Sequence, residues 1–362
     1  FPEAIAAFDE VIKLNANYGP VYRELAETYY FWSTNAGDKA KREEYIKKAV
    51  DFSAKYKSLT DNSIESRMRH ADFLILAKDY QALQLEAEEM QKLDKVNPRI
   101  LRYLGYASYE NKKYDESIKA LNDFIAKADA KRVTGRDYLF LSKAKLAKAI
   151  SPEGTIADKA MFDNAMADLK KATEIDPAIG AEFSDLGVDL YKKKLYLEAI
   201  PVFAAATKAP DSPNALLDNF YLGNAVLFYV ANDLDTDEKR KDPKVQEMLK
   251  LADVAYGNVV AGSPTTQDAH LNRAKINRFI VGEEGKTNAV AAYEKYIEVV
   301  TTKGEAEMAK DSVKAGLIGA YSYIGSHYAI SDKVKAKENF EKALALDPTS
   351  QYIKESLDVL KK

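Results

Sequence analysis

The chain has 362 residues, of which 46% are hydrophobic and 30% are charged, and its formal net charge is −3. This composition is ordinary for a folded chain and argues against disorder, and the near balance of 53 basic and 56 acidic residues gives no reason to expect a nucleic-acid partner. Cysteine is absent, which excludes disulfides, zinc fingers and cysteine nucleophiles. The longest uninterrupted apolar run, residues 225–231, is too short to cross a bilayer as a helix, so no transmembrane segment is expected in this chain.

One pattern recurs along the chain. A small residue is followed by a ring or leucine four positions later, by another small residue after three more, and then by proline. The clearest copies are Ala165-x3-Leu169-x2-Ala172 before Pro177, Ala252-x3-Tyr256-x2-Val259 before Pro264, and Ala336-x3-Phe340-x2-Ala343 before Pro348. With weaker copies included, the starts are residues 4, 42, 83, 117, 165, 199, 252, 289 and 336. Two intervals are 34 residues and the others are longer, so one unit of 34 residues with insertions accounts for all of them.

A second pattern, leucine followed by glycine or alanine, precedes most copies. It occurs at Leu25-Ala26, Leu104-Gly105, Leu186-Gly187 and Leu222-Gly223. Together the two patterns resemble the tetratricopeptide repeat (TPR), a helix–turn–helix unit. The resemblance implies an all-α fold: a right-handed α-solenoid of antiparallel helix pairs, with about 18 helices and no sheet.

Glycine in the middle of a helix costs about 1 kcal/mol relative to alanine. Gly105, Gly187 and Gly223 are therefore expected where two helices approach too closely for a larger side chain. The corresponding position in the last pair is expected near Ile318-Gly319-Ala320.

In chain order, the pattern predicts a single solenoid over residues 1–362. Residues 1–16 are expected to form the second helix of a truncated repeat, and residues 18–348 to form eight helix pairs. Residues 349–362 are expected to form a C-terminal helix that caps the last repeat with Ile353, Leu357 and Leu360.

Insertions are expected near residues 33–39, 150–159 and 232–244, at turns where added length costs little. The third should be a solvated loop or a charged helical extension. The chain begins inside a second helix and without methionine, so we expect that residue 1 is not the start of the gene product. This leaves room for a signal peptide or a membrane anchor upstream of residue 1.

Two segments resemble parts of ligand-binding motifs. The segment from Gly282 to Thr287 ends like a phosphate-binding loop, but Ile280 occupies the position of the required first glycine. The aspartates at 233, 235 and 237 begin like a calcium loop, but Glu238 and Lys244 stand where glycine and glutamate are needed. The three histidines lie far apart, at 70, 270 and 327. No metal or cofactor is therefore expected, and no residues are placed for catalysis, so we predict that the protein is not an enzyme.

In TPR solenoids the first helices of the pairs line a concave groove that suits a peptide or a partner helix. Transferring the inward positions of the repeat to this chain gives the residues predicted to bind a partner. They are Arg23, Glu27, Tyr30, Arg102, Tyr106, Tyr109, Lys143, Tyr191, Phe220, Asn224, Lys275 and Arg278. Tyrosine and arginine are enriched at interface hot spots, which favours protein recognition.

The resulting prediction is a non-catalytic scaffold that binds a peptide or partner protein along the groove, as a subunit of a larger assembly. An alternative is an accessory or assembly subunit of a bacterial cell-envelope complex for secretion, outer-membrane assembly or surface uptake. The lack of cysteine, the 23 tyrosines and the incomplete first repeat resemble repeat proteins of that compartment. The predicted location is accordingly the bacterial periplasm or cell envelope, with the cytoplasm as the alternative. A regulatory module of a larger enzyme and an RNA-binding helical repeat remain as further alternatives, the latter disfavoured by Glu27 and Asp72 on the inward face.

Overall fold

The computed structural model describes residues 1–209 and 211–361, and 80% of the structure is helical. They contain 20 α-helices, of which α13 and α17 have only four residues. The other 18 agree with the predicted number. Within the described ranges there is no sheet, and extended pairing is limited to one antiparallel bridge between Ile150 and Ile156 in the second predicted insertion. The all-α class is therefore confirmed.

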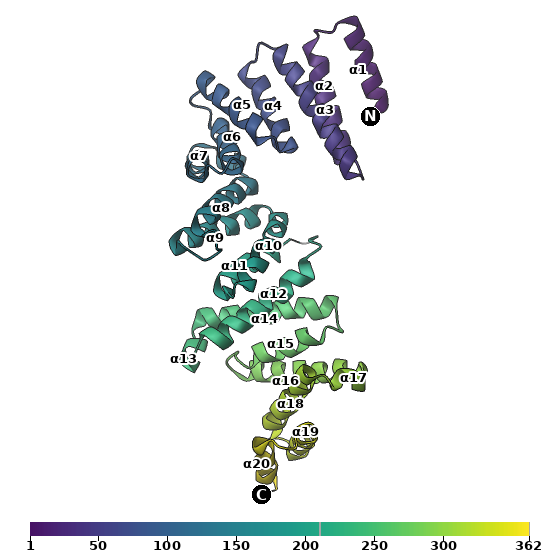
Figure 1. The fold of residues 1–362 in the computed structure, drawn as a ribbon, viewed down its shortest axis with the longest axis vertical. Coiled ribbons are helices and arrows are strands. Elements are labelled where there is room, and N and C mark those ends of the chain that lie inside the picture. The colour runs from purple at the N-terminus through teal and green to yellow at the C-terminus, as the bar shows by residue number, and fades with distance from the viewer. Residues whose placement is uncertain (210, 362) are drawn as a thin grey trace. The chain divides into compact units, whose positions relative to one another are not determined.

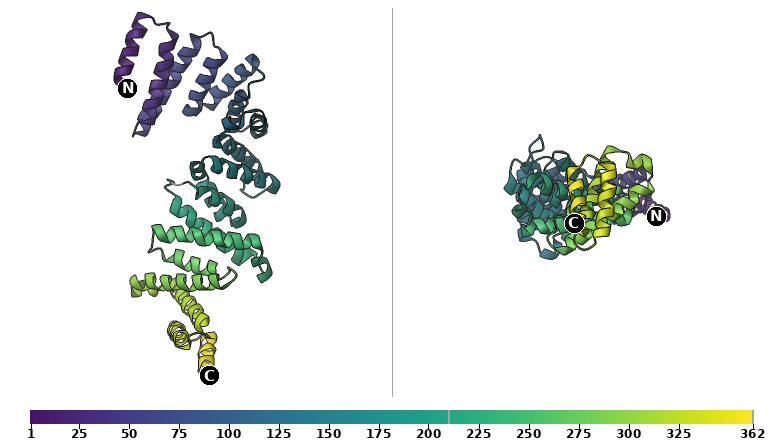
Figure 2. Two further views of the ribbon diagram at one scale, coloured as in Figure 1. Left: turned by 180° about the vertical axis from the view of Figure 1, so that it is seen from behind. Right: turned by 90° about the horizontal axis from the view of Figure 1, so that it is seen from below.

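The chain divides into two compact units, Phe1–Asp176 and Pro177–Lys362. Figure 1 shows the helices of both units, and Figure 2 shows them from behind. That the two units form one continuous solenoid stays a prediction. The helices of the first unit are α1 (Pro2–Leu14), α2 (Gly19–Thr34), α3 (Lys39–Ser58), α4 (Ile64–Ala77), α5 (Tyr80–Leu93), α6 (Pro98–Glu110), α7 (Tyr114–Lys127), the 3-10 turn η1 (Ala130–Arg132), α8 (Gly135–Ala149) and α9 (Lys159–Ile175). Those of the second unit are the 3-10 helix η2 (Pro177–Phe183), α10 (Ser184–Lys192), α11 (Tyr196–Ala206), α12 (Ala215–Phe228), the π-helical turn η3 (Tyr229–Asp233), α13 (Asp237–Arg240), α14 (Pro243–Gly262), α15 (Gln267–Asn277), α16 (Glu283–Thr302), α17 (Glu305–Met308), α18 (Asp311–Tyr328), α19 (Lys333–Leu346) and α20 (Gln351–Leu360).

Consecutive helices pack against each other in pairs. The first unit holds α1 beside α2 and then the pairs α2/α3, α4/α5, α6/α7 and α8/α9. The second holds α10/α11, α12/α14, α15/α16 and α18/α19, with α20 beside α19. Within each unit a pair also contacts the next pair, so the apolar faces are buried between neighbouring helices rather than in one central core.

Glycine allows the two helices of a pair to approach closely. A Cβ atom on Gly187 would lie 2.6 Å from Cε1 of Phe203, and one on Gly105 would lie 2.5 Å from Cγ of Leu121. Gly223 faces Tyr256 in the same way, at 2.5 Å. Real Cβ atoms do not approach their neighbours so closely, which is why packing outweighs helix propensity at these positions. The predicted register is right in all three pairs.

The predicted register is wrong in two other pairs. Gly319 has no atom within 4 Å of a would-be Cβ, whereas a Cβ on Gly325 would lie 3.0 Å from the Phe340 ring. The close approach of α18 to its partner helix α19 is therefore at Gly325, six residues later than predicted. In α3, Arg42 is exposed while Ala49 is buried, so the small position of that repeat is Ala49.

The insertion at residues 232–244 is more than a solvated loop. It forms η3 and α13, and its Leu234 side chain is buried. Nη2 of Arg240 donates to the Leu234 carbonyl at 2.8 Å, and the guanidinium lies 5.3 Å from the centre of the Phe279 ring. The prediction missed this packing because Phe279 lies more than thirty residues further along the chain.

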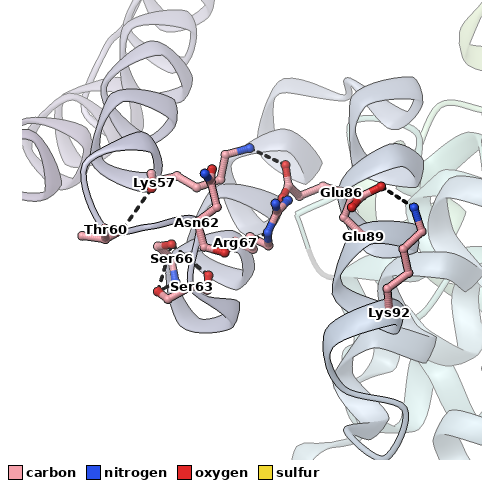
Figure 3. Close-up of polar contacts among 9 residues, drawn as sticks. All are labelled: Lys57, Thr60, Asn62, Ser63, Ser66, Arg67, Glu86, Glu89 and Lys92. Atoms are coloured by element: carbon pink, nitrogen blue, oxygen red, sulfur yellow. Dashed lines mark hydrogen bonds and ion pairs between the residues drawn. The ribbon is translucent and has the colours of Figure 1, made fainter.

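A buried ionic cluster joins three helices in the first unit (Figure 3). Glu86 of α5 accepts hydrogen bonds from Lys57 Nζ of α3, at 2.5 Å, and from Nη1 of Arg67 of α4. Two cations on one buried carboxylate offset much of its desolvation cost. The cluster therefore ties the α2/α3 pair to the α4/α5 pair.

Candidate functional site

The first helices of the pairs lie on the inner side of each stack. Several neighbouring first helices contact one another directly: α6 contacts α8 in the first unit, and α12 contacts both α10 and α15 in the second. Among the residues described, no two second helices of successive pairs make comparable contact. Helices on the inside of a curved stack are closer together than those on the outside, so within each unit the first helices form the inner surface.

In the first unit, side chains of α2, α4 and α6 form one continuous, partly exposed surface. Arg69 Nη1 of α4 donates to Glu27 Oε1 of α2 at 3.2 Å, and Arg99 Nη2 of α6 donates to Asp72 Oδ2 of α4 at 2.5 Å. We call this surface the first-helix face. It consists of Arg23, Glu27, Tyr30 and Phe31 of α2, Arg69, Asp72 and Leu76 of α4, and Arg99 and Arg102 of α6.

Two large apolar side chains stand exposed on this face beside the ion pairs. Phe31 is 54% exposed and Leu76 is 38% exposed. Phe31 lies one turn beyond Glu27, and Leu76 lies one turn beyond Asp72, so both share a helix face with a paired carboxylate. Tyr30 bridges the two helices, because its ring meets that of Phe73 edge-on with centroids 6.3 Å apart. The face thus offers apolar contacts beside fixed charges.

Arg102, at the end of the face, is held by a buried carboxylate. Its Nε donates to Asp137 Oδ1 at 2.7 Å and its Nη2 donates to Oδ2 at 2.8 Å, and Asp137 of α8 is 0% exposed. Asp137 also accepts from the Thr134 backbone N–H at 2.7 Å, which caps α8. This network joins the α6/α7 pair to the α8/α9 pair.

Tyr106, which was predicted to bind a partner, belongs to the same buried network. Its hydroxyl donates to Asp137 Oδ1 at 2.8 Å, its ring stacks on Phe140 at 4.2 Å, and the residue is 3% exposed. Burial, reinforced by the Asp137 carboxylate, raises the pKa of Tyr106 well above its ordinary value, so the hydroxyl keeps its proton. Tyr106 therefore has no surface to offer a partner, which corrects its placement in the groove.

The other predicted residues of the first unit are only partly accessible. Tyr109 is half-buried, with its ring edge-on to Phe140 at 5.5 Å. Lys143 is half-buried as well. Arg23 is half-buried and pairs with its neighbour Glu24 at 2.6 Å. Of the residues predicted in this unit, Glu27 and Tyr30 contact the neighbouring first helix α4, whereas Arg23 pairs within α2 and Arg102 pairs with Asp137 of α8.

The predicted residues of the second unit do not form a comparable surface. Asn224 is buried, and its side-chain oxygen accepts from the Tyr256 hydroxyl at 2.7 Å and from Asn272 Nδ2 at 3.0 Å. A partner in the groove therefore cannot reach it, which corrects this prediction too. Phe220 packs edge-on against Tyr256 at 6.2 Å. Tyr191 packs among other aromatic rings, and burial raises its pKa to about 12.

The last two residues predicted in the second unit are Lys275, which lies on α15, and Arg278, which follows it directly. Burial lowers the pKa of Lys275 below its ordinary value. Arg278 is exposed and stands over the Tyr323 ring at 5.2 Å.

Phe31, Leu76, Arg69 and Arg99 belong to the face but were missed in the sequence analysis. A helical spacing of four residues from Glu27 and from Asp72 was the signal that could have found the first two. Arg99 gave no such signal, because its role depends on the position of Asp72 on another helix.

One contact has the residue types of a nucleophile and its base. His70 Nδ1 lies 2.8 Å from Ser53 Oγ. Ser53 is only 3% exposed, so no substrate carbonyl can reach its hydroxyl. That hydroxyl donates its proton to the Val50 carbonyl at 2.8 Å. In the described part of the chain, no group of three or more His, Asp or Glu side chains is placed to hold a metal ion, and no helix is long and apolar enough to cross a bilayer.

The class of the protein follows from the geometry of its helices. The paired helices and their glycine contacts give the chain a TPR-like helical-repeat fold. No protein-family model matches it, and neither does any curated protein.

Several solved structures are similar to the chain. The C-terminal part of a TPR repeat-containing protein from Cytophaga hutchinsonii is 24% identical, with a TM-score of 0.36 over 80% of this chain and 99% of that one. A tetratricopeptide repeat protein from Parabacteroides merdae is 14% identical, with a TM-score of 0.32 over 83% of this chain and 100% of that one. YrrB, described as a TPR protein with an unusual peptide-binding site, is 17% identical, with a TM-score of 0.34 over 68% of this chain and 100% of that one.

Proposed function

We propose that the protein is a non-catalytic interaction scaffold whose first-helix face binds a peptide segment of a partner protein within a larger assembly. One observation carries the proposal. Three successive first helices present a single surface in which exposed Phe31 and Leu76 stand beside cross-helix ion pairs.

The physical basis is that this face can provide both affinity and register. Covering Phe31 and Leu76 stabilises a complex by about 25 cal/mol per Å² of apolar surface removed from water. The charges of Arg69, Asp72 and Arg99 are already paired within the chain, so a peptide lying across them meets oriented donors and acceptors. A peptide with alternating apolar and polar side chains fits this arrangement.

The proposal is tested by selecting peptides from a random library on the intact protein and counter-screening them on two variants. Phe31→Ala/Leu76→Ala removes the apolar contacts of the face. Leu85→Ala/Leu93→Ala removes two exposed leucines of α5, a second helix, and serves as the matched control.

The selected peptides should bind the control as they bind the wild type and bind the face variant at least tenfold more weakly, as expected for lost hot-spot contacts. Peptides that bind all three proteins equally would place the binding surface elsewhere, and a failure to select any peptide would contradict the scaffold function.

A further inference from the structure

A cavity of about 490 Å³ opens at the end of the first-helix face, between α6, α7 and η1. Arg99 and Arg102 belong both to the face and to the cavity wall, so the two are continuous. The other charged wall residues are Lys127, Asp129 and Arg132. Four cations therefore surround this space, with a single carboxylate among them.

The pairing of these charges leaves a positive excess. Arg99 pairs with Asp72 and Arg102 pairs with Asp137, while the carboxylate of Asp129 accepts from the Lys131 backbone N–H at 2.9 Å and caps η1. Lys127 and Arg132 are exposed, and their side chains form no ion pair with any described residue. The adjoining segment 127–136 adds Lys131 and Arg136 without adding another acid.

Arg102 is oriented before any ligand arrives. Asp137 holds its Nε and Nη2, the Arg132 carbonyl accepts a further hydrogen bond from Nη2, and the guanidinium lies 4.4 Å from the centre of the Phe124 ring. Its Nη1 is the guanidinium nitrogen without a hydrogen bond to any described residue. A guanidinium fixed in this way loses little conformational freedom when it binds an oxyanion.

The start of α6 adds to the positive potential of the cavity. Asn97 and Pro98 line the wall, and Asn97 caps the helix by accepting from the Arg99 backbone N–H at 3.1 Å. The partial positive charge at a helix N-terminus favours an anion, although by less than the side-chain charges do.

We propose that this cavity binds an acidic side chain of the partner peptide, with either a carboxylate or a phosphate as its charged group. The proposal rests on the function proposed above, because the peptide that lies on the first-helix face reaches the cavity through Arg99 and Arg102. A peptide suits the site better than a nucleic acid. The cavity is small, and the adjoining face carries Glu27 and Asp72 instead of a continuous basic track.

The test measures the binding of three labelled probes to the full chain by fluorescence anisotropy at low salt. The probes are a glutamate-rich peptide, the same peptide with glutamine in place of glutamate, and a glutamine-based peptide that carries one phosphoserine. Lys127→Ala/Arg132→Ala removes the two unpaired cations. Lys41→Ala/Lys47→Ala makes the same charge change on exposed residues of α3 and is the control.

At least one acidic probe should bind the wild type about tenfold more tightly than the glutamine probe. The cavity variant should bind that acidic probe about tenfold more weakly than the wild type does, whereas the control variant should keep most of the wild-type affinity. The difference should shrink as salt is added, because exposed charges are screened. Preference for the glutamate probe identifies the source of the charge as a carboxylate, and preference for the phosphoserine probe identifies it as a phosphate.

Equal binding of acidic and glutamine probes would overturn the cavity proposal while leaving the scaffold function standing, and so would equal losses in the two variants. Tighter binding of a single-stranded RNA oligonucleotide, lost in the cavity variant, would overturn the choice of a peptide. Thermal unfolding of both variants confirms that they are folded.

Discussion

Replacing Gly187 by alanine tests the helix packing, because the same substitution at Gly319 should have the opposite effect. Both glycines lie inside helices of the second unit, and alanine improves helix propensity by about 1 kcal/mol at either position. At Gly319 nothing lies within 4 Å of the new Cβ, so the gain is kept. At Gly187 the Cβ would lie 2.6 to 2.9 Å from three atoms of the Phe203 ring.

Phe203 cannot move aside easily. It is buried, and its ring stacks on Tyr221 with centroids 5.5 Å apart. Overpacking of this kind costs about 1–3 kcal/mol, which exceeds the gain in propensity. Gly187→Ala should therefore destabilise the protein by about 1 kcal/mol net, whereas Gly319→Ala should stabilise it by up to about 1 kcal/mol.

The assay is urea unfolding of the full chain followed by circular dichroism. Gly187→Leu should lie at the upper end of the overpacking range and, in a linear array of helices, should separate unfolding into two transitions. If Gly187→Ala is as stable as the wild type, or if the two alanine variants shift in the same direction, the packing described for this pair is wrong.

Three further predictions concern the buried polar groups and the insertion. Burial, helped by the nearby Lys57 charge, lowers the pKa of His70 from 6.5 to about 4. Between pH 6.5 and pH 4, His70 is therefore protonated in the unfolded chain but neutral in the folded chain. Acidification from pH 6.5 to 4 should remove up to about 3 kcal/mol of the free energy of unfolding. In urea titrations across this range His70→Gln should lose that pH dependence while His327→Gln keeps it, and an unchanged slope in His70→Gln would count against the assignment. Asp137→Ala should cost about 3–5 kcal/mol, because it leaves Arg102 without its buried partner, whereas Tyr106→Phe removes one hydrogen bond and should cost about 1 kcal/mol; equal unfolding midpoints for the two variants would refute the network. Replacing residues 232–244 by a Gly-Ser turn should lower the midpoint, and Arg240→Ala should cost about 1 kcal/mol while exposed Lys241→Ala costs almost nothing; a Gly-Ser variant as stable as the wild type would show that the insertion adds nothing to the core.

The fold was predictable because the pattern that specifies it is local. Gly187 and Phe203 are sixteen residues apart and lie on two consecutive helices, so the sequence spacing alone indicates their contact. The prediction failed where that local signal was ambiguous. Helix α18 contains glycines at 316, 319 and 325. The first faces Tyr296 of α16 and the last faces Phe340 of α19, and only these contacts distinguish them.

The site was less predictable because it depends on contacts between pairs. The residue after Gly105 faces inward in an isolated pair, which is why Tyr106 was expected in the groove. In the molecule α8 packs over that position and places Asp137 within 2.8 Å of the Tyr106 hydroxyl. Arg102 likewise points where Asp137 holds it, and no pattern within the α6/α7 repeat carries that information.

The most direct test of the account is site-specific photo-crosslinking of a peptide selected on the intact protein. A photoreactive residue is placed in turn at Phe31, at Leu76 and, as a control, at Leu85, which is 66% exposed on the second helix α5. The peptide should be captured from Phe31 and from Leu76, on successive first helices, and not from Leu85. Capture from Leu85 as efficient as from the other two positions, or capture from neither Phe31 nor Leu76, would contradict the claim that the first-helix face binds the partner.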